Sequence, residues 1–199
     1  MKDDPRLDRL RTVLEARRPV PLDPPASARA AVAVVFRDSP RGLEVLFIRR
    51  AEHPQDPWSG QMAFPGGRSE PLDPDLRATA IRETREETGL DLDGARFLGA
   101  LDELQARGRL RRMDLSIQPF VFSVEGDAPT APSEEVFSLH WIALDALTAS
   151  QAAGTYLYTL GDAAVELPCL RVDGIVIWGL TYRMFQELAA VLGDDTARP

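Results

Sequence analysis

Cysteine and histidine are almost absent from this chain of 199 residues. Cys169 is the single cysteine, so the chain cannot form an internal disulfide, and this fits a reducing compartment such as the cytoplasm. The two histidines, His53 and His140, lie far apart in the sequence and match no zinc-ligand spacing. We therefore expect neither a disulfide scaffold nor a zinc site, and we expect Cys169 to be a small buried hydrophobe rather than a nucleophile.

The chain also lacks long apolar runs and an excess of basic residues. No stretch approaches about 18 consecutive apolar residues, and no basic start is followed by an apolar run, so we expect neither a membrane span nor a secretory signal. Lys and Arg number 23 against 31 Asp and Glu, a net charge of −8. This balance argues against a nucleic-acid-binding surface. We expect a cytoplasmic protein whose hydrophobic content of 44% supplies a proper core.

Short apolar segments alternate with helical patterns along the chain. Helices are predicted over 5–18, 75–88, 143–151 and 179–192, and strands over 30–36, 43–49, 61–64, 95–101, 114–124, 136–142, 156–160 and 164–168. This order favours a layered α/β domain. We assign residues 1–25 to an N-terminal helix and a Pro-rich connector, 26–193 to the main domain and 194–199 to a frayed tail. The N-terminal helix is expected to pack on the domain; the alternative is that it binds a partner, which would allow a homodimer.

The most informative segment is residues 82–89, Arg-Glu-Thr-Arg-Glu-Glu-Thr-Gly. Glu83, Glu86 and Glu87 stand at i, i+3 and i+4, so they share one face of the predicted helix. Like charges at this spacing repel each other by about 0.2–0.5 kcal/mol, which a bound hard cation would offset. Oxygen ligands suit magnesium, manganese or calcium rather than zinc. The alternative is an ordinary solvated helix face, with Arg82 and Glu86 as an i,i+4 ion pair.

Glycines frame this helix on both sides. Gly66-Gly67, preceded by Phe64-Pro65, allow a tight turn or a close approach of the backbone. Gly89 is placed to end the helix in a left-handed cap, and Asp75 is placed to begin it as the N-cap. The combination is more specific than the charged helix face alone, and it disfavours the solvated-face alternative.

Together these residues resemble the Nudix hydrolase box. That pattern runs Gly, five residues, Glu, seven residues, and then Arg-Glu-apolar-x-Glu-Glu-x-Gly-apolar. Its second half matches Arg82, Glu83, Glu86, Glu87, Gly89 and Leu90 here. Thr84 stands at the first apolar position, and Asp73 replaces the first Glu, with eight residues rather than seven between it and Arg82. A one-residue insertion in the loop before the helix accounts for the spacing and leaves the role of Asp73 open.

The resemblance implies an α/β (α+β) fold in which a mixed β-sheet is sandwiched between α-helices. It implies metal-dependent hydrolysis of a pyrophosphate bond in a nucleoside-diphosphate-linked substrate, with Mg²⁺ or Mn²⁺ as the cofactor. The implied metal ligands are Glu83, Glu86, Glu87 and, through its backbone carbonyl, Gly67. The implied catalytic residues are Glu83, which orients or deprotonates water, Glu86, and Arg82, which orients a glutamate. Without metal, this helix face is expected to be solvated.

Residues outside the box complete the predicted site. A fourth carboxylate could come from Glu103, Glu134 or Glu135, although surface charge is the favoured interpretation of each one. Trp58 could stack on a base or pack in the core. The predicted substrate-binding residues are Arg49, Arg50, Trp58 and Arg68. The expected partner is thus a small-molecule nucleotide, with no nucleic acid and no membrane.

Within this family, the chain most resembles the coenzyme A pyrophosphatase group. The likeness rests on residues 60–67, 66–75, 78–83, 118–121 and 177–181. It implies hydrolysis of coenzyme A, or of an acyl or oxidised form, to 3′,5′-ADP and phosphopantetheine. That group usually has Leu-Arg-x-His-x-Gly-Gln before the box, whereas Asp56-Pro57-Trp58 replaces the Arg and His here. The open alternatives are another nucleotide (an NDP-sugar, ADP-ribose, a dinucleoside polyphosphate or a (d)NTP) and a non-catalytic nucleotide-binding module.

Overall fold

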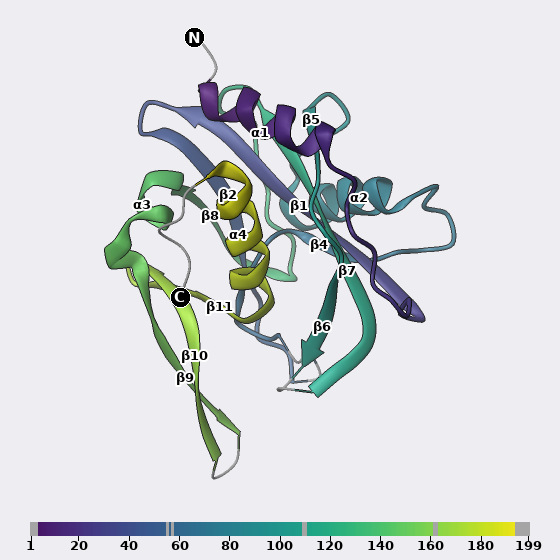
Figure 1. The fold of residues 1–199 in the computed structure, drawn as a ribbon, viewed down its shortest axis with the longest axis vertical. Helices are drawn as coiled ribbons and strands as arrows, with labels where there is room; N and C mark the ends of the chain where they lie inside the picture. Colours follow the sequence, from purple (N-terminus) through teal and green to yellow (C-terminus); the bar gives the residue numbers. More distant parts are fainter. Residues whose placement is uncertain (1–3, 55, 57, 109–110, 161–162, 194–199) are drawn as a thin grey trace.

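The fold is a mixed β-sheet between helices, with a smaller second sheet at one end (Figure 1). The computed structural model describes residues 4–54, 56, 58–108, 111–160 and 163–193. The helices are α1 (Pro5–Ala16), α2 (Leu76–Thr88), α3 (Leu144–Thr148) and α4 (Gly179–Leu192), with a 3₁₀ turn, η1, at Ser150–Ala152. The strands are β1 (Ala28–Ser39), β2 (Gly42–Arg50), β3 (Met62–Ala63), β4 (Gly66–Arg68), β5 (Arg96–Ala100), β6 (Leu104–Gly108), β7 (Arg111–Val124), β8 (Val136–Ala143), β9 (Ala153–Leu160), β10 (Ala163–Val172) and β11 (Ile175–Trp178). The predicted tail at 194–199 lies outside the described residues.

The predicted box helix is confirmed at both ends. The Asp75 carboxylate accepts the Ala78 N–H at 2.8 Å, and Gly89 ends the helix with φ of 70°. Three strands, β4, β6 and β11, were not predicted. Each forms because a neighbouring strand supplies backbone partners, β1 for β4, β7 for β6 and β10 for β11, and in β4 and β6 such pairing outweighs weak local propensity. The predicted helix at 143–151 was too long, since α3 ends at Thr148 and η1 follows.

The main sheet has eight strands, in the order β3-β2-β1-β7-β5 with β8, β4 and β6 paired to β2, β1 and β7. β1 runs parallel to β7 and antiparallel to β2 and β4, so the sheet is mixed, as the family resemblance implied. β9, β10 and β11 form the smaller antiparallel sheet, which extends away from the main one (Figure 1). The hairpin predicted for β9 and β10 is confirmed, and its turn at 161–162 lies outside the described residues.

β1 supplies both hydrophobic cores because its side chains alternate between the two faces of the sheet. Ala30, Val32, Val34 and Phe36 pack in the cluster that contains α1 and α4. Ala31, Ala33 and Val35 pack in the cluster that contains α2. The box helix therefore lies on one side of the sheet, and α1 and α4 lie on the other (Figure 1).

The N-terminal helix α1 packs on its own domain, as predicted. Leu7, Leu10 and Leu14 are buried in the first core cluster, while Val13 is 37% exposed. The helix contacts β5 and α4. Within the ranges that the structure describes, no helix is long and apolar enough to cross a membrane. Cys169 is buried, as the sequence analysis expected.

Candidate active site

A cavity of about 330 Å³ lies where the box helix α2 meets β4. Its volume is within the usual range of small-molecule sites, about 300–1,000 Å³. Glu83 and Glu87 from α2 and Glu135 from the segment before β8 form its acidic side. β4 is fixed in place because Gly66 and Gly67 pair with Val32 and Ala31 in the middle of β1. The cavity thus has a rigid floor from the buried central strand.

The two glycines of β4 let backbone and carboxylate approach closely. Gly66 has φ of 151°, and a Cβ there would lie 2.2 Å from the Ala31 carbonyl oxygen. A Cβ on Gly67 would lie 2.5 Å from both carboxylate oxygens of Glu83. Only glycine at position 67 therefore leaves room for the Glu83 carboxylate where it lies now.

We expect a Gly67→Ala variant to fold and to lose most of its hydrolytic activity. The new methyl group would displace the end of the flexible Glu83 side chain, and misplacing a reacting group by about 1 Å can cost roughly 100-fold in rate. Gly66→Ala is the contrasting variant, because its methyl group would meet backbone atoms of Ala31 and Val32 and should lower the melting temperature. Thermal melts and steady-state rates would separate the two. Native activity in Gly67→Ala would contradict the inference that Gly67 makes room for the Glu83 carboxylate.

Glu87 is the most enclosed of the three box glutamates. Its side chain is 5% exposed, and its Oε2 accepts the Gly66 N–H at 2.8 Å. Burial raises the pKa of Glu87 to about 7, against the opposing effects of the Gly66 N–H and of Arg50, whose Nη1 lies 3.6 Å from Oε1. A buried carboxylate that is costly to ionise would be stabilised by a bound cation.

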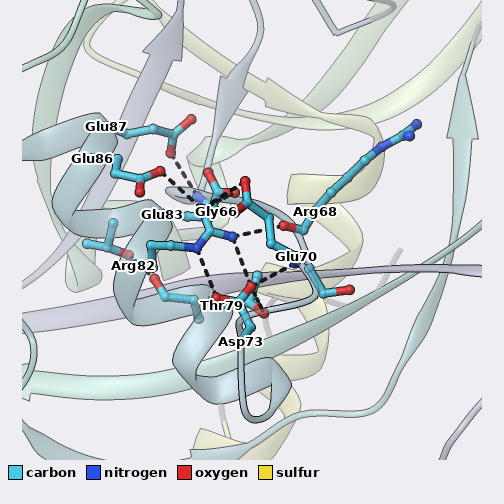
Figure 2. Close-up of polar contacts among 12 residues, drawn as sticks. Gly66, Arg68, Glu70, Asp73, Thr79, Arg82, Glu83, Glu86 and Glu87 are labelled. Carbon is cyan, nitrogen blue, oxygen red and sulfur yellow. Dashed lines mark hydrogen bonds and ion pairs between the residues drawn. The ribbon is translucent and has the colours of Figure 1, made fainter.

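Arg82 joins the other two box glutamates. Its Nη1 donates to Glu83 Oε1 at 3.0 Å and to Glu86 Oε2 at 3.1 Å, which Figure 2 shows from the side of the helix. Glu83 is 18% exposed and burial raises its pKa, whereas Glu86 is 57% exposed. The expectation of a solvated helix face was therefore wrong for Glu83 and Glu87, because β4 packs over that part of the helix.

Asp73, whose role the sequence left open, anchors Arg82. Its Oδ1 and Oδ2 accept from Nε and Nη2 of Arg82 at 3.0 Å each, and Thr79 Oγ1 and the Glu70 N–H also donate to Oδ2 (Figure 2). The Arg82 guanidinium holds the pKa of Asp73 well below its usual range. The longer loop before the helix therefore still delivers a carboxylate to Arg82.

We expect Asp73→Asn to destabilise the protein by about 2 kcal/mol near neutral pH, since a charge-assisted hydrogen bond contributes roughly 1.5–3 kcal/mol. The pKa of Asp73 is lower in the folded state than in the unfolded state, so its contribution is present above about pH 4 and is lost as the pH falls toward the folded pKa. Urea denaturation at about pH 7 and about pH 3 would measure this. Asp93→Asn, at a 68% exposed position, is the matched control. An equal loss at both pH values would contradict the assignment.

Arg50 links the box helix to the loop before β3. Its Nε donates to Asp56 Oδ2 at 2.8 Å, and Asp56 Oδ1 accepts the Trp58 N–H at 2.9 Å. Trp58 packs against the core, which was one of the two roles considered for it, and it also lines the cavity. Stacking on a base or ring stays a prediction. The Trp58 indole Nε1 is buried without a hydrogen-bond partner in the described structure. The sequence did not predict that Asp56 binds Arg50. The only signal for this contact was the presence of an Arg six residues before the Asp.

The remaining predicted residues fall in different places. Arg68 lines the same cavity, although its side chain points away from the three glutamates in Figure 2. Arg49 lines a second cavity instead. Of the candidate fourth carboxylates, Glu135 lies close enough to raise the pKa of Glu83 and Glu87. Glu103 pairs with Arg29 outside the cavity.

The donor set fits a hard divalent cation. Among the described residues, no three His, Cys, Asp or Glu side chains are already grouped tightly enough to hold a metal ion, because Arg82 and Arg50 engage the glutamates. The side-chain donors that Glu83, Glu87 and Glu135 offer to the cavity are carboxylate oxygens, which Mg²⁺ and Mn²⁺ prefer. The enclosed Glu87 and the Gly67 cradle around Glu83 add to this fit. A bound cation would replace part of the arginine contacts.

Much of the cavity lining is apolar, a feature that the sequence did not predict. The apolar lining consists of Ala30, Val32, Met62, Phe64, Leu115, Ile117, Leu180 and Met184. The Thr181 hydroxyl donates to the Met62 carbonyl at 2.9 Å and so ties α4 to β3. The cavity can therefore hold a ligand that has both an anionic and an apolar part.

Comparison with known proteins identifies the family. The model of the NUDIX domain matches residues 27–159. The chain belongs to the Nudix hydrolase family. It is accordingly a pyrophosphohydrolase that acts on nucleotide pyrophosphates. The mixed sheet and the helices around it are the Nudix α/β fold, as predicted.

Two curated relatives are similar in sequence to this Nudix hydrolase. The uncharacterized Nudix hydrolase NudL of Yersinia pestis (strain Pestoides F) is 31% identical over 165 residues, which cover 81% of this chain and 77% of the relative. An uncharacterized protein of Schizosaccharomyces pombe is 36% identical over 149 residues, or 64% of this chain. The match covers 44% of that relative, so the chain spans less than half of its length.

Solved structures support the fold. A Caenorhabditis elegans Ap4A hydrolase in a binary complex superposes with a TM-score of 0.50 and 20% identity, covering 59% of this chain and 81% of the other. A MutT/nudix family protein of Enterococcus faecalis superposes with a TM-score of 0.50 and 16% identity, covering 92% of this chain and 73% of the other. Identities this low bear on the architecture alone.

Proposed function

We propose that this Nudix hydrolase cleaves the pyrophosphate bond of coenzyme A or its derivatives, giving 3′,5′-ADP and phosphopantetheine. The observation that carries the proposal is a cavity that combines Glu83 and Glu87 with apolar lining residues such as Met62 and Met184. Coenzyme A joins its pyrophosphate to a long chain with apolar segments. A sugar in the same place would leave hydroxyl groups without hydrogen-bond partners, at roughly 1–3 kcal/mol each.

The contacts within the site support the following proposed roles. Glu83, Glu86, Glu87 and the Gly67 carbonyl are the proposed ligands of Mg²⁺ or Mn²⁺, which when bound would neutralise phosphate charge and acidify water. Glu83 would orient the attacking water and accept its proton. Arg82, held by Asp73, would fix the positions of Glu83 and Glu86.

Two arginines are proposed to contact the phosphates. Arg50 and Arg68 both line the cavity that holds the carboxylates. A guanidinium group matches the geometry of phosphate oxygens and stays charged at all relevant pH values. Arg50 is already oriented by Asp56, so it can serve without further ordering.

A second proposal is that another nucleotide is the substrate. The loop before β3 supports it. Asp56 and Trp58 stand where the coenzyme A group usually carries Arg and His. Asp56 binds Arg50, and the Trp58 ring lines the cavity, where it could stack on a base or ring. NDP-sugars, ADP-ribose, dinucleoside polyphosphates and (d)NTPs are the substrates to compare.

Product analysis by mass spectrometry tests these proposals. The purified protein with Mg²⁺ would be offered coenzyme A, acetyl-CoA, ADP-ribose, an NDP-sugar, a diadenosine polyphosphate and a dNTP in parallel. Fastest release of phosphopantetheine or its acetylated form together with 3′,5′-ADP is the expected result. Faster cleavage of another substrate would reject coenzyme A. No cleavage with Mg²⁺ or Mn²⁺ would favour the non-catalytic module, and Glu83→Gln protein prepared in parallel controls for contaminating hydrolases.

A further inference from the structure

A second cavity of about 640 Å³ lies next to the catalytic one. The two cavities share Asp56, Gln61 and Met62, so the loop before β3 and the start of that strand separate them. The second cavity is lined by residues of the main sheet, from β2 and β8, and of the small sheet, from β9 and β11. A substrate whose pyrophosphate lies at the box carboxylates could therefore extend into both cavities.

The small sheet gives this second cavity an aromatic wall. Tyr156 and Tyr158 are two residues apart on β9, so they project from the same face of the sheet. Their rings lie 4.7 Å and 5.1 Å from the Trp178 ring on β11, with interplanar angles of 23° and 40°. All three side chains are partly exposed and line the cavity. Aromatic groups presented in this way form a stacking surface for a planar ligand.

The main sheet contributes a positive charge to the same cavity. The Arg49 guanidinium lies 4.9 Å from the centre of the Phe137 ring, which is 68% exposed. No carboxylate in the described parts of the chain forms an ion pair with Arg49, unlike Arg50 and Arg82, so its charge is available to a ligand. His140 also lines the cavity, where its Nε2 lies 2.7 Å from the Ser138 hydroxyl. The cavity thus combines a stacking surface with a cation.

We propose that this second cavity binds the purine nucleotide half of the substrate, with the base on the Tyr156–Trp178 wall and the ribose 3′-phosphate at Arg49. The inference rests on the proposed function, because it takes the substrate to be a nucleoside 3′-phosphate joined through its 5′-pyrophosphate to an apolar chain. With the 5′-pyrophosphate at the box carboxylates and the chain against the apolar lining residues of the catalytic cavity, the 3′-phosphate is the remaining anionic group. Arg49 is the cation that the second cavity offers to it.

Calorimetric titration of 3′,5′-ADP and of 5′-AMP, with a chelator present, tests this without any requirement for metal or catalysis. Arg49→Gln is expected to weaken 3′,5′-ADP binding by about tenfold or more and 5′-AMP binding by less than about threefold, because 5′-AMP lacks the 3′-phosphate. Tyr156→Leu is expected to weaken both nucleotides by about the same factor, roughly fivefold or more, because stacking does not depend on that phosphate.

Arg77→Gln is the matched control. Arg77 is another exposed arginine over an aromatic ring, 5.1 Å from the Phe97 centre, and it lies on α2 away from the second cavity. The inference is overturned if native protein does not bind 3′,5′-ADP, or if Arg49→Gln and Arg77→Gln bind it equally. Coenzyme A cleavage with unchanged binding in Arg49→Gln would reject this subsite and keep the proposed function. Arg49-dependent binding without coenzyme A cleavage would keep the subsite and reject the proposed function.

Discussion

A Glu83→Gln variant is expected to hydrolyse its substrate about 1,000-fold more slowly than the native enzyme. The substitution keeps the size of the side chain but removes a proposed metal ligand that is also the proposed proton acceptor, and general base catalysis alone typically contributes about 10²–10⁴-fold. The loss should fall mainly on kcat, because the glutamate acts on the attacking water rather than on bound substrate. Steady-state kinetics at saturating Mg²⁺ would measure it.

Glu70→Gln is the matched control for this variant. Glu70 also approaches Arg82, at 4.0 Å, but its side chain is 60% exposed and it does not line the catalytic cavity. We expect its kcat to stay within about threefold of the native value, as for most exposed surface positions. If Glu83→Gln retained activity in that same range, Glu83 would be neither ligand nor base, and the mechanism proposed above would be wrong.

A Glu87→Gln variant is expected to be more stable than the native protein without metal and to lose its response to Mg²⁺. The pKa of Glu87 rises from 4.5 to about 7 on folding. The stability contributed by this group is therefore fully present below about pH 4.5 and is lost as the pH rises through about 7. Removing the ionised group should stabilise the metal-free protein at about pH 8 by up to roughly 3 kcal/mol, and by little at about pH 5.

Added Mg²⁺ should make the native protein more stable than the Glu87→Gln variant. Binding at about 100 times the dissociation constant stabilises a folded protein by about 2.7 kcal/mol, and only the native chain should gain this. Melting temperatures with Mg²⁺ or chelator at two pH values would record both effects. Glu86→Gln, which changes the same charge at a 57% exposed position on the same helix, should alter metal-free stability little. A Glu87→Gln protein that is less stable than native in chelator at about pH 8 would contradict the assignment.

The sequence was sufficient to predict the box helix and both of its caps, and the family resemblance implied the mixed sheet. The helix and its caps depend on local signals, the N-cap at Asp75 and the left-handed Gly89. The sequence also placed three carboxylates on one helix face, but it could not rank their burial. That ranking is set by β4, which packs over Glu83 and Glu87 and leaves Glu86 in solvent.

Ion pairs between distant segments likewise could not be predicted from the sequence. Asp73 binds Arg82 across a loop with an inserted residue, so a spacing rule would have discarded it. Arg49 and Arg50 are neighbours in a strand, yet they line different cavities because adjacent side chains point to opposite faces. The sequence predicted that both arginines bind substrate, and only the three-dimensional arrangement separates their proposed roles.

The short loop that carries Asp56 and Trp58 borders both cavities, while the box carboxylates are held on the helix α2 of the rigid scaffold. In the mechanism proposed above, reaction chemistry and substrate choice are therefore carried by different parts of the chain. Substitutions in this loop can change which molecules are accepted without disturbing the acids that the reaction needs, since loops tolerate sequence change more readily than the elements that they connect. A new specificity could thus arise within this protein in small steps, each of which keeps a working enzyme.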